Sequence, residues 1–346
     1  MTLPPAGRAT AEAPANIAFV KYWGASDLER ALPVNPSISM TLSRCVSRTT
    51  VDFDPTAGGD QVRLRVRDGE PPVDPGEAFA RRVRAHLEAL RRRFGLPAGA
   101  GRFLVETGNS FPAAAGLASS ASGFAALAAA TAAALGRHPG PRELSSLARL
   151  SGSGSATRSA LGGYVEWPAP GGEPEDPCAG QLAAATHWDL RDVIAVVETG
   201  AKEVPSLAGH RVAATSPHFE RRQAELPRRL AAVRGAIAER DLGRLGATIE
   251  EEAIELHVVA MTSRPAIFYW APATLGVLAA VRALRRDGVE AWSTMDAGAN
   301  VHVITSAAHE PAVARRLREV EGVRDLILDQ VGDGPVVDGE LVGSEG

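Results

Sequence analysis

The chain has 346 residues, 45% of them hydrophobic, and a formal net charge of −4. This length allows one large or two ordinary domains with a substantial core. The mild acidic charge gives no basic footprint for nucleic acid, and the two cysteines, Cys45 and Cys178, exclude a disulfide framework or a cysteine-rich metal site. Residues 1–16 lack the apolar segment of a secretory signal, and no apolar run reaches the roughly 18 residues of a membrane helix. We therefore expect a cytoplasmic protein with no membrane partner.

The first predicted strand, residues 15–22, ends at Lys21 and Tyr22 and is followed by Trp23 and Gly24. A lysine at a strand end usually reaches solvent. Beside two aromatic rings and a glycine it is more typical of the wall of a binding site. The pattern then predicts a turn at 33–36, strands at 37–42, 49–53 and 61–66, an amphipathic helix at 75–94 and a strand at 103–107.

The stretch that follows, residues 111–128, reads FPAAAGLASSASGFAALA. Its alanines and leucines favour a helix to about residue 135, Gly116 allows close backbone approach, and Ser119 or Ser120 suits the first turn. A helix N-terminus can hold phosphate, so this stretch is a candidate phosphate loop, although it lacks the Gly-Lys-Ser/Thr of a Walker A motif. A buried alanine-rich helix capped by serine is the alternative.

A second Ser/Gly-rich run, SGSGSATRS at residues 151–159, comes directly after a predicted helix at 141–150. Such a run can be a flexible linker. Arg158 lies inside it, however, and a strand at 161–167 follows at once. Serine hydroxyls together with a guanidinium suit a carboxylate or a phosphate, which favours a binding site over a linker.

The C-terminal half predicts strands and helices without regular βαβ alternation. Asp296 opens the sequence DAGAN between two short strands, where a structural turn is the alternative to a functional loop. His257 is predicted at a helix end, in a packing or capping role. The mixture favours an α+β fold with two lobes, residues 1–189 and 190–346. The predicted strands are 190–197, the two parts of 291–304, and 326–331, and the predicted helices are 220–240, 242–257, 272–285 and 310–320.

Seven stretches, taken together and in order, resemble the mevalonate diphosphate decarboxylases of the GHMP kinase superfamily. They lie at residues 16–24, 32–42, 109–123, 151–167, 214–219, 295–300 and 330–335. The resemblance implies the two-lobed GHMP kinase fold, with an N-terminal nucleotide-binding lobe and the active cleft between the lobes. It also implies ATP and Mg²⁺ as cofactors, a phosphorylated hydroxy acid as substrate, and a homodimer.

The implied reaction moves the γ-phosphoryl group of ATP to the 3-hydroxyl of a 5-phosphorylated mevalonate, after which phosphate and CO₂ leave. In this resemblance Asp296 looks like the carboxylate that orients or deprotonates the hydroxyl, and Lys21 looks like the cation beside it. Arg158, with Ser153 and Ser155, looks like the clamp on the substrate carboxylate and chain.

The remaining implied contacts concern phosphate groups. Tyr22, Ser206 and His210 are expected at the phosphate of the substrate. Gly116, Ser119 and Ser120 are expected at the phosphates of ATP, with Mg²⁺ bridging those phosphates and no dedicated protein metal site. Asn16 and the segment 37–39 are expected to line the same cleft.

The chain departs from the family pattern at the phosphate end of the substrate. Ala25 and Leu207 stand where the family commonly has lysine and arginine, and His210 stands where methionine is usual. Fewer cations favour a less charged phosphate, so mevalonate 5-phosphate is a serious substrate candidate, although Lys202 or Arg211 could compensate. A kinase that stops at phosphorylation and a catalytically silent binding protein are the alternative functions.

Overall fold

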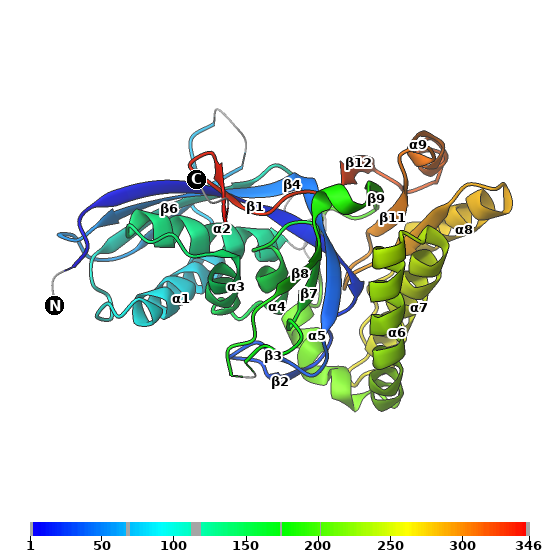
Figure 1. Cartoon of the computed structure of the whole chain (residues 1–346), viewed down its shortest axis with the longest axis horizontal. Coiled ribbons are helices and arrows are strands. Elements are labelled where there is room, and N and C mark those ends of the chain that lie inside the picture. The colour runs from blue at the N-terminus through cyan, green and yellow to red at the C-terminus, as the bar shows by residue number, and fades with distance from the viewer. Residues whose placement is uncertain (1–2, 67–69, 112–118, 174, 201, 344–346) are drawn as a thin grey trace.

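The structure, a computed structural model, describes residues 3–66, 70–111, 119–173, 175–200 and 202–343, except for the side chain of Ser119. The predicted α+β class is confirmed: two antiparallel-dominated sheets are each covered by helices (Figure 1). Within the described part of the chain, none of the helices combines the length and the apolar character needed to cross a lipid bilayer.

The larger sheet is built on two long antiparallel strands, β1 (Gly7–Val20) and β4 (Ser37–Asp54). The sequence pattern predicted two strands within 37–53, but β4 is continuous. Ser43 and Arg44 interrupt the alternation because β4 bulges there, and the Asp329 carboxylate accepts both of their N–H groups at 2.9 Å. The other strands of this sheet are β5 (Gln61–Arg65), β6 (Arg102–Asn109), β7 (Tyr164–Trp167), β8 (Gly180–Ala183), β13 (Val336–Val337) and β14 (Glu340–Leu341).

Four helices lie along one face of the larger sheet (Figure 1). They are α1 (Glu77–Arg93), α2 (Ser119–Ala134), α3 (Pro141–Arg149) and α4 (Gly154–Arg158). The alanines of α2 are buried on nearly every side, because small side chains let this helix lie close against β1 and β4. The linker alternative for the Ser/Gly run at 151–159 is wrong, because the second half of the run forms the buried helix α4.

The smaller sheet has the strand order β10-β11-β9-β12, and all of its pairs are antiparallel. Its strands are β9 (Leu190–Val196), β10 (Ala291–Thr294), β11 (Val301–Ser306) and β12 (Asp325–Gln330). The helices that accompany it are α5 (Ser206–Val212), α6 (Phe219–Glu239), α7 (Leu242–Thr262), α8 (Pro272–Arg286) and α9 (Glu310–Arg318). A short ribbon of β2 (Ala25–Asp27) and β3 (Leu32–Pro33) lies apart from both sheets.

Helix α7 runs beyond the end predicted for it, so His257 lies inside the helix rather than at its end. The predicted packing role of His257 is confirmed, because its buried ring lies against Tyr269 and Trp270. The hydrophobic residues of α7 continue past His257, and the sequence at His257 contains no glycine or proline that would end a helix.

One hydrophobic cluster joins the two sheets. Ile17 and Met40 of the larger sheet pack in the same buried cluster as Ile194 of the smaller sheet and Leu226 of α6. The C-terminal strand β13 also returns to pair with β1, at Ala11 and Val337. A division of the chain at residues 189 and 190 stays a prediction, and this shared core fixes the ends of β1 and β10 relative to each other.

Candidate active site

Lys21 and Asp296, which are 275 positions apart in the chain, meet between the two sheets. The Lys21 ammonium donates a hydrogen bond to Asp296 Oδ1 at 2.9 Å and another to the Ala18 carbonyl at 2.6 Å. Lys21 directly follows β1, and Asp296 lies in the loop between β10 and β11. The lysine side chain is 2% exposed, whereas that of Asp296 is 29% exposed. The carboxylate therefore remains open to a molecule entering from solvent.

Lys21 and Asp296 shift each other's pKa. Burial raises the pKa of the Asp296 carboxyl, but the charge and hydrogen bond of Lys21, helped by His302 and Arg158, outweigh burial and hold that pKa below its usual range. For Lys21 burial wins, so the pKa of its ammonium is lowered although Asp296 and Glu252 oppose the shift. The pair thus joins a carboxylate to a cation that burial makes unusually acidic.

Arg158 supplies a second buried cation beside this pair. One Nη donates to Ser37 Oγ at 2.6 Å and the other to Asn16 Oδ1 at 3.3 Å. Among the described residues no carboxylate lies within ion-pair distance of Arg158, and its Nε has no hydrogen-bond partner. Burial lowers the pKa of its guanidinium to about 10, with Asp296 and Tyr22 opposing. A buried guanidinium that faces neutral partners is suited to an incoming anion.

The short helix α4 brings the predicted serines to the same region. The hydroxyls of Ser153 and Ser155 lie 3.1 Å apart at its first turn, and Asn16 donates to the Ser155 carbonyl at 3.2 Å. Glycine is required at position 154, because a Cβ there would lie 2.6 Å from the Tyr22 ring and 2.7 Å from Trp167. Tyr22, which follows β1, and Trp167 of β7 thus pack directly on the Ser/Gly run.

Of the residues predicted to contact the substrate phosphate, His210 lies against Tyr22. The His210 ring stacks against Tyr22 and Trp23 at centroid distances of 4.3 and 4.8 Å, and its Nδ1 accepts the Gly24 N–H at 3.0 Å. Burial, with the charge of Arg222, lowers the pKa of His210 to about 4, so this ring is neutral near pH 7. Burial raises the pKa of the Tyr22 phenol to about 12. Ser206 begins α5, the helix that carries His210.

The Asp296 loop is fixed by side chains that the sequence pattern did not single out. Asn300 Oδ1 accepts the N–H groups of Val197 and Glu198 at 2.7 and 2.9 Å, and Thr274 donates to the Ala299 carbonyl at 2.7 Å. The end of the Lys202 side chain lies against Gly298 of this loop, and burial lowers its pKa. Asn300 in the sequence DAGAN was the available signal for this role, because the side chain of a turn asparagine often forms hydrogen bonds with the main chain.

The predicted ATP-phosphate residues are only partly within the described residues. Gly116 lies outside them, and so does the side chain of Ser119, whose backbone begins α2. Ser120 is exposed in the first turn of α2. The assignment of these three residues to ATP stays a prediction.

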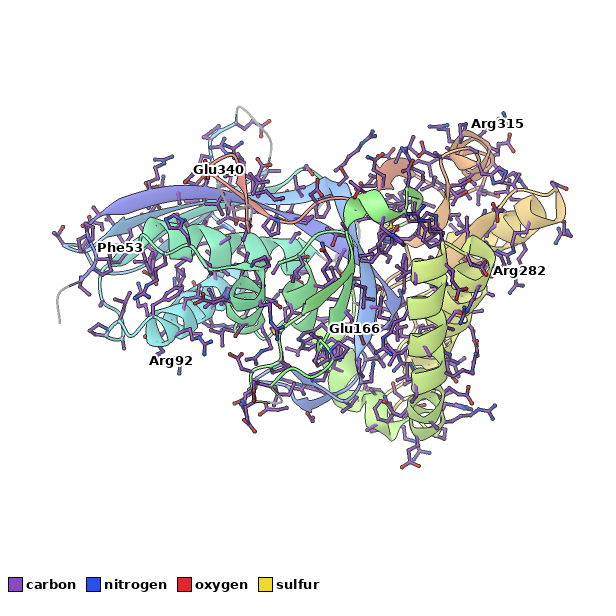
Figure 2. All side chains as sticks on the ribbon, in the orientation of Figure 1. Phe53, Arg92, Glu166, Arg282, Arg315 and Glu340 are labelled. Carbon is purple, nitrogen blue, oxygen red and sulfur yellow. The ribbon has the colours of Figure 1, made fainter. Side chains whose placement is uncertain are left out.

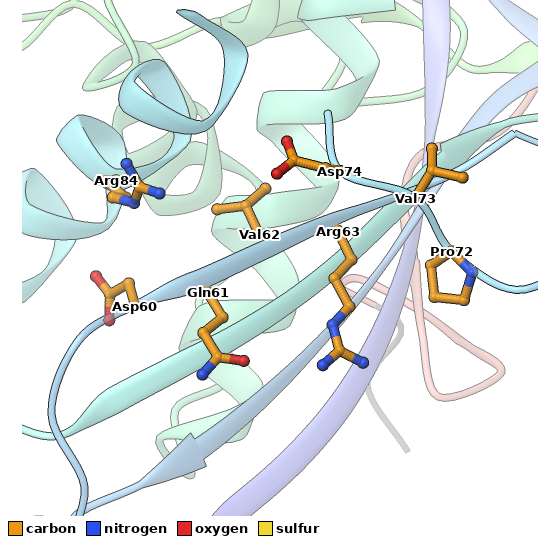
Figure 3. Close-up of a pocket in the computed structure, with 8 residues that line it drawn as sticks. All are labelled: Asp60, Gln61, Val62, Arg63, Pro72, Val73, Asp74 and Arg84. Atoms are coloured by element: carbon orange, nitrogen blue, oxygen red, sulfur yellow. The ribbon is translucent and has the colours of Figure 1, made fainter. Parts of the chain in front are cut away.

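A shallow pocket at the edge of the larger sheet lies away from these residues (Figure 3). It is lined by residues of β5 and α1 and by the segment 72–74. Its Asp60 carboxylate already accepts both Nη groups of Arg91, at 2.8 and 2.5 Å, and the Phe103 N–H at 2.9 Å. This acid holds the fold together rather than facing a ligand.

Two models of known protein families match this chain, one in each half. Residues 13–179 match the diphosphomevalonate decarboxylase-like N-terminal domain, and residues 192–325 match the mevalonate 5-diphosphate decarboxylase C-terminal domain. The chain is 37% identical to the diphosphomevalonate decarboxylase of Ganoderma lucidum over 321 residues, which cover 87% of this chain and 79% of the relative.

Solved structures agree in fold. The mevalonate diphosphate decarboxylase of Staphylococcus aureus superposes with a TM-score of 0.87 at 33% identity, covering 96% of this chain and 98% of that one. A structure described as MDDEF in complex with MVAPP, AMPPCP and magnesium gives a TM-score of 0.86 at 34% identity, covering 96% and 99%. The two-lobed GHMP-type fold expected from the sequence is therefore confirmed. This chain belongs to the mevalonate diphosphate decarboxylase family and is an ATP-dependent decarboxylase.

Proposed function

We propose that this enzyme phosphorylates the 3-hydroxyl of mevalonate 5-diphosphate and then decarboxylates it. The observation that carries the proposal is the Lys21–Asp296 pair, whose charged atoms are 2.9 Å apart. Beside it lies the buried Arg158, which forms no ion pair with any described carboxylate. The names of the matching relatives support the 5-diphosphate as substrate, and none of them supports the 5-monophosphate.

In the first step the 3-hydroxyl oxygen attacks the γ-phosphorus of ATP. A new O–P bond forms as the bond to the ADP oxygen breaks, and the hydroxyl proton passes to Asp296. Asp296 suits this work because its low pKa keeps it ionised and its side chain is partly open. The Lys21 ammonium holds the carboxylate in place and lies where negative charge moves during the transfer.

In the second step the carbon–carbon bond to the carboxylate breaks and releases CO₂. Its electron pair forms the alkene while the bond to the 3-phosphate breaks and phosphate leaves. We assign Arg158 to the substrate carboxylate, because Ser37 and Asn16 fix its guanidinium and no described acid competes for it. Ser153 and Ser155 offer hydroxyls beside it.

ATP and Mg²⁺ complete the proposal. A structural neighbour is described in complex with AMPPCP and magnesium, which supports the same pair of ligands here. The described residues hold no group of three or more histidines, cysteines or acids arranged as a metal site. Because Mg²⁺ is commonly held by substrate phosphates, we expect the phosphates of ATP to carry the ion into the site. We place the phosphates at the start of α2, near Ser119 and Ser120.

The test is to incubate the enzyme with MgATP and mevalonate 5-diphosphate labelled in its carboxylate. We expect ADP and labelled CO₂ in equal amounts. ADP formation without CO₂ would replace the proposal by a 3-hydroxyl kinase. No ADP above the rate without substrate, across a panel of phosphorylated hydroxy acids, would favour a silent binding protein.

One observation favours a second substrate, mevalonate 5-phosphate. Three residues at the expected phosphate end are neutral: Ala25, Leu207 and the His210 ring, whose pKa is lowered to about 4. A monophosphate needs fewer cations than a diphosphate. The ratio of kcat/KM for the two substrates decides between them, and a strong preference for the diphosphate would reject the second candidate.

A further inference from the structure

The main chain of Lys21 is held from behind by two buried charged side chains. Glu252 of α7 accepts the Lys21 N–H at 3.1 Å, and Arg222 of α6 donates to the Lys21 carbonyl at 2.9 Å. Asn35 donates to the same carbonyl at 3.0 Å. Arg222 and Glu252 are completely buried and form an ion pair with each other. Both polar groups of the Lys21 main chain are thereby fixed from the α6–α7 pair.

Stability alone is a poor explanation for this ion pair. Two nitrogens of Arg222, Nε and Nη1, are buried without a hydrogen-bond partner among the described residues. Each such donor costs free energy of folding. Replacing a buried ion pair by apolar residues of similar size is often neutral or stabilising. What Arg222 and Glu252 supply in return is a fixed position for the residue whose ammonium meets Asp296.

We propose that Arg222 and Glu252 are positioning residues for the reaction, which set the placement of the Lys21 ammonium against Asp296 by holding the Lys21 main chain. This inference rests on the proposed function, because it assumes that Lys21 acts in the chemistry. Neither residue is proposed to touch the substrate.

The charge of Glu252 adds a second effect on Lys21. The charged groups that act most on the ammonium are Asp296 after β10, Glu252 on α7 and Arg158 on α4. Buried Asp192 of β9 and His257 of α7 also interact with it. Asp296 and Glu252 raise the pKa of Lys21, while Arg158 and burial lower it. Removing the Glu252 charge should therefore make Lys21 lose its proton at lower pH.

The decisive variant replaces both charges at once, Arg222→Met with Glu252→Met. Arg229, which also pairs with Glu252, keeps its ion pairs with Glu251 and Glu255. The double replacement therefore leaves the charge of Arg229 paired. We expect a melting temperature close to that of the wild type, and a kcat lower by about ten- to a hundredfold, as for a misplaced catalytic group. The KM for MgATP should change little.

The single variant Glu252→Gln gives the readout that a structural role would not produce. The alkaline limb of its pH–kcat/KM profile should move to lower pH. The matched control is Glu166→Gln, at the buried Glu166 of β7 (Figure 2). Glu166 pairs with Arg234 of α6 at 2.9 Å, and its described hydrogen bonds do not include Lys21. The control should leave the profile unchanged.

Lys21→Met separates this inference from the proposed function. Wild-type turnover in Lys21→Met would overturn the role of Lys21 itself. An inactive Lys21→Met together with wild-type kcat and pH profile in the folded double variant would overturn only the positioning role. If the double variant does not fold, Glu252→Gln decides alone: an unshifted profile, or the same shift in the Glu166 control, rejects the inference.

Discussion

The reactive end of the proposed site and its phosphate end differ in the charge of the residues that form them. At the reactive end Lys21, Asp296 and Arg158 are charged and lie close together, and both cations are buried. At the phosphate end His210 is neutral and stacked, and Ala25 and Leu207 carry no charge. Chemistry that creates and moves charge needs fixed countercharges, whereas recognition of a remote phosphate can be shared with other groups. The two ends should therefore respond differently to mutation.

The largest effect is expected from Asp296→Asn, which breaks the reactive end. The amide cannot accept the hydroxyl proton, so kcat should fall by about two to four orders of magnitude. Binding of an ATP analogue should persist, as measured by calorimetric titration. Asp325→Asn, an exposed position on β12, is the control and should turn over normally. Near-normal turnover of Asp296→Asn would remove the assigned role.

Arg158→Lys should lower kcat/KM by about ten- to a hundredfold. An ammonium cannot bind Ser37, Asn16 and a substrate carboxylate in one plane as a guanidinium can. CO₂ release should fall at least as much as ADP formation. The half-exposed Arg102, paired with Asp54, offers Arg102→Lys as a control. Equal losses in the two variants would argue against a specific role for Arg158.

At the phosphate end, the combined change Ala25→Lys and Leu207→Arg tests recognition alone. Two added cations should raise kcat/KM for mevalonate 5-diphosphate relative to the 5-monophosphate by about tenfold, because charge-assisted hydrogen bonds discriminate by that order. The kcat with the preferred substrate should stay close to wild type. An unchanged ratio would mean that neither position faces the phosphate.

The smallest effect concerns pH. Because burial lowers the pKa of Lys21 below 10.5, kcat/KM should begin to fall at a pH below that value as the ammonium loses its proton. The lowered pKa of Asp296 places the titration of this carboxyl at a lower pH than that of an ordinary aspartate. Lys21→Arg should move the alkaline limb upward, whatever its effect on the absolute rate. An alkaline limb with its midpoint at or above pH 10.5 would contradict the lowered pKa of Lys21.

The sequence predicted the fold class, most elements and the residues that meet at the reactive end. Lys21 and Arg158 could be singled out because each places a charge in a strand or Ser/Gly pattern that does not need one. Asp296 was singled out by the family resemblance, since an aspartate is ordinary in a turn. The structure brings the three together, as the resemblance implied. Their catalytic roles remain predictions.

Other features of the structure could not be predicted from the local sequence. Arg222 and Glu252 lie in charged helical segments that are typical of solvated faces, and only the packing of α6 and α7 against β1 buries them. The short helices α4 and α5 were missed because five to seven residues carry too little periodicity. The bulge in β4 depends on Asp329, a residue remote in sequence.

The central claim is that Lys21 and Asp296 act as one unit, and a double-mutant cycle tests it most directly. The rates of CO₂ release would be measured for Lys21→Met, for Asp296→Asn and for the variant that carries both. Groups that work as a unit lose their effect together, so the double variant should be no slower than the slower single variant. If the fold-reduction in the rate of CO₂ release for the double variant equals the product of the two single reductions, the account is contradicted and the two residues contribute independently.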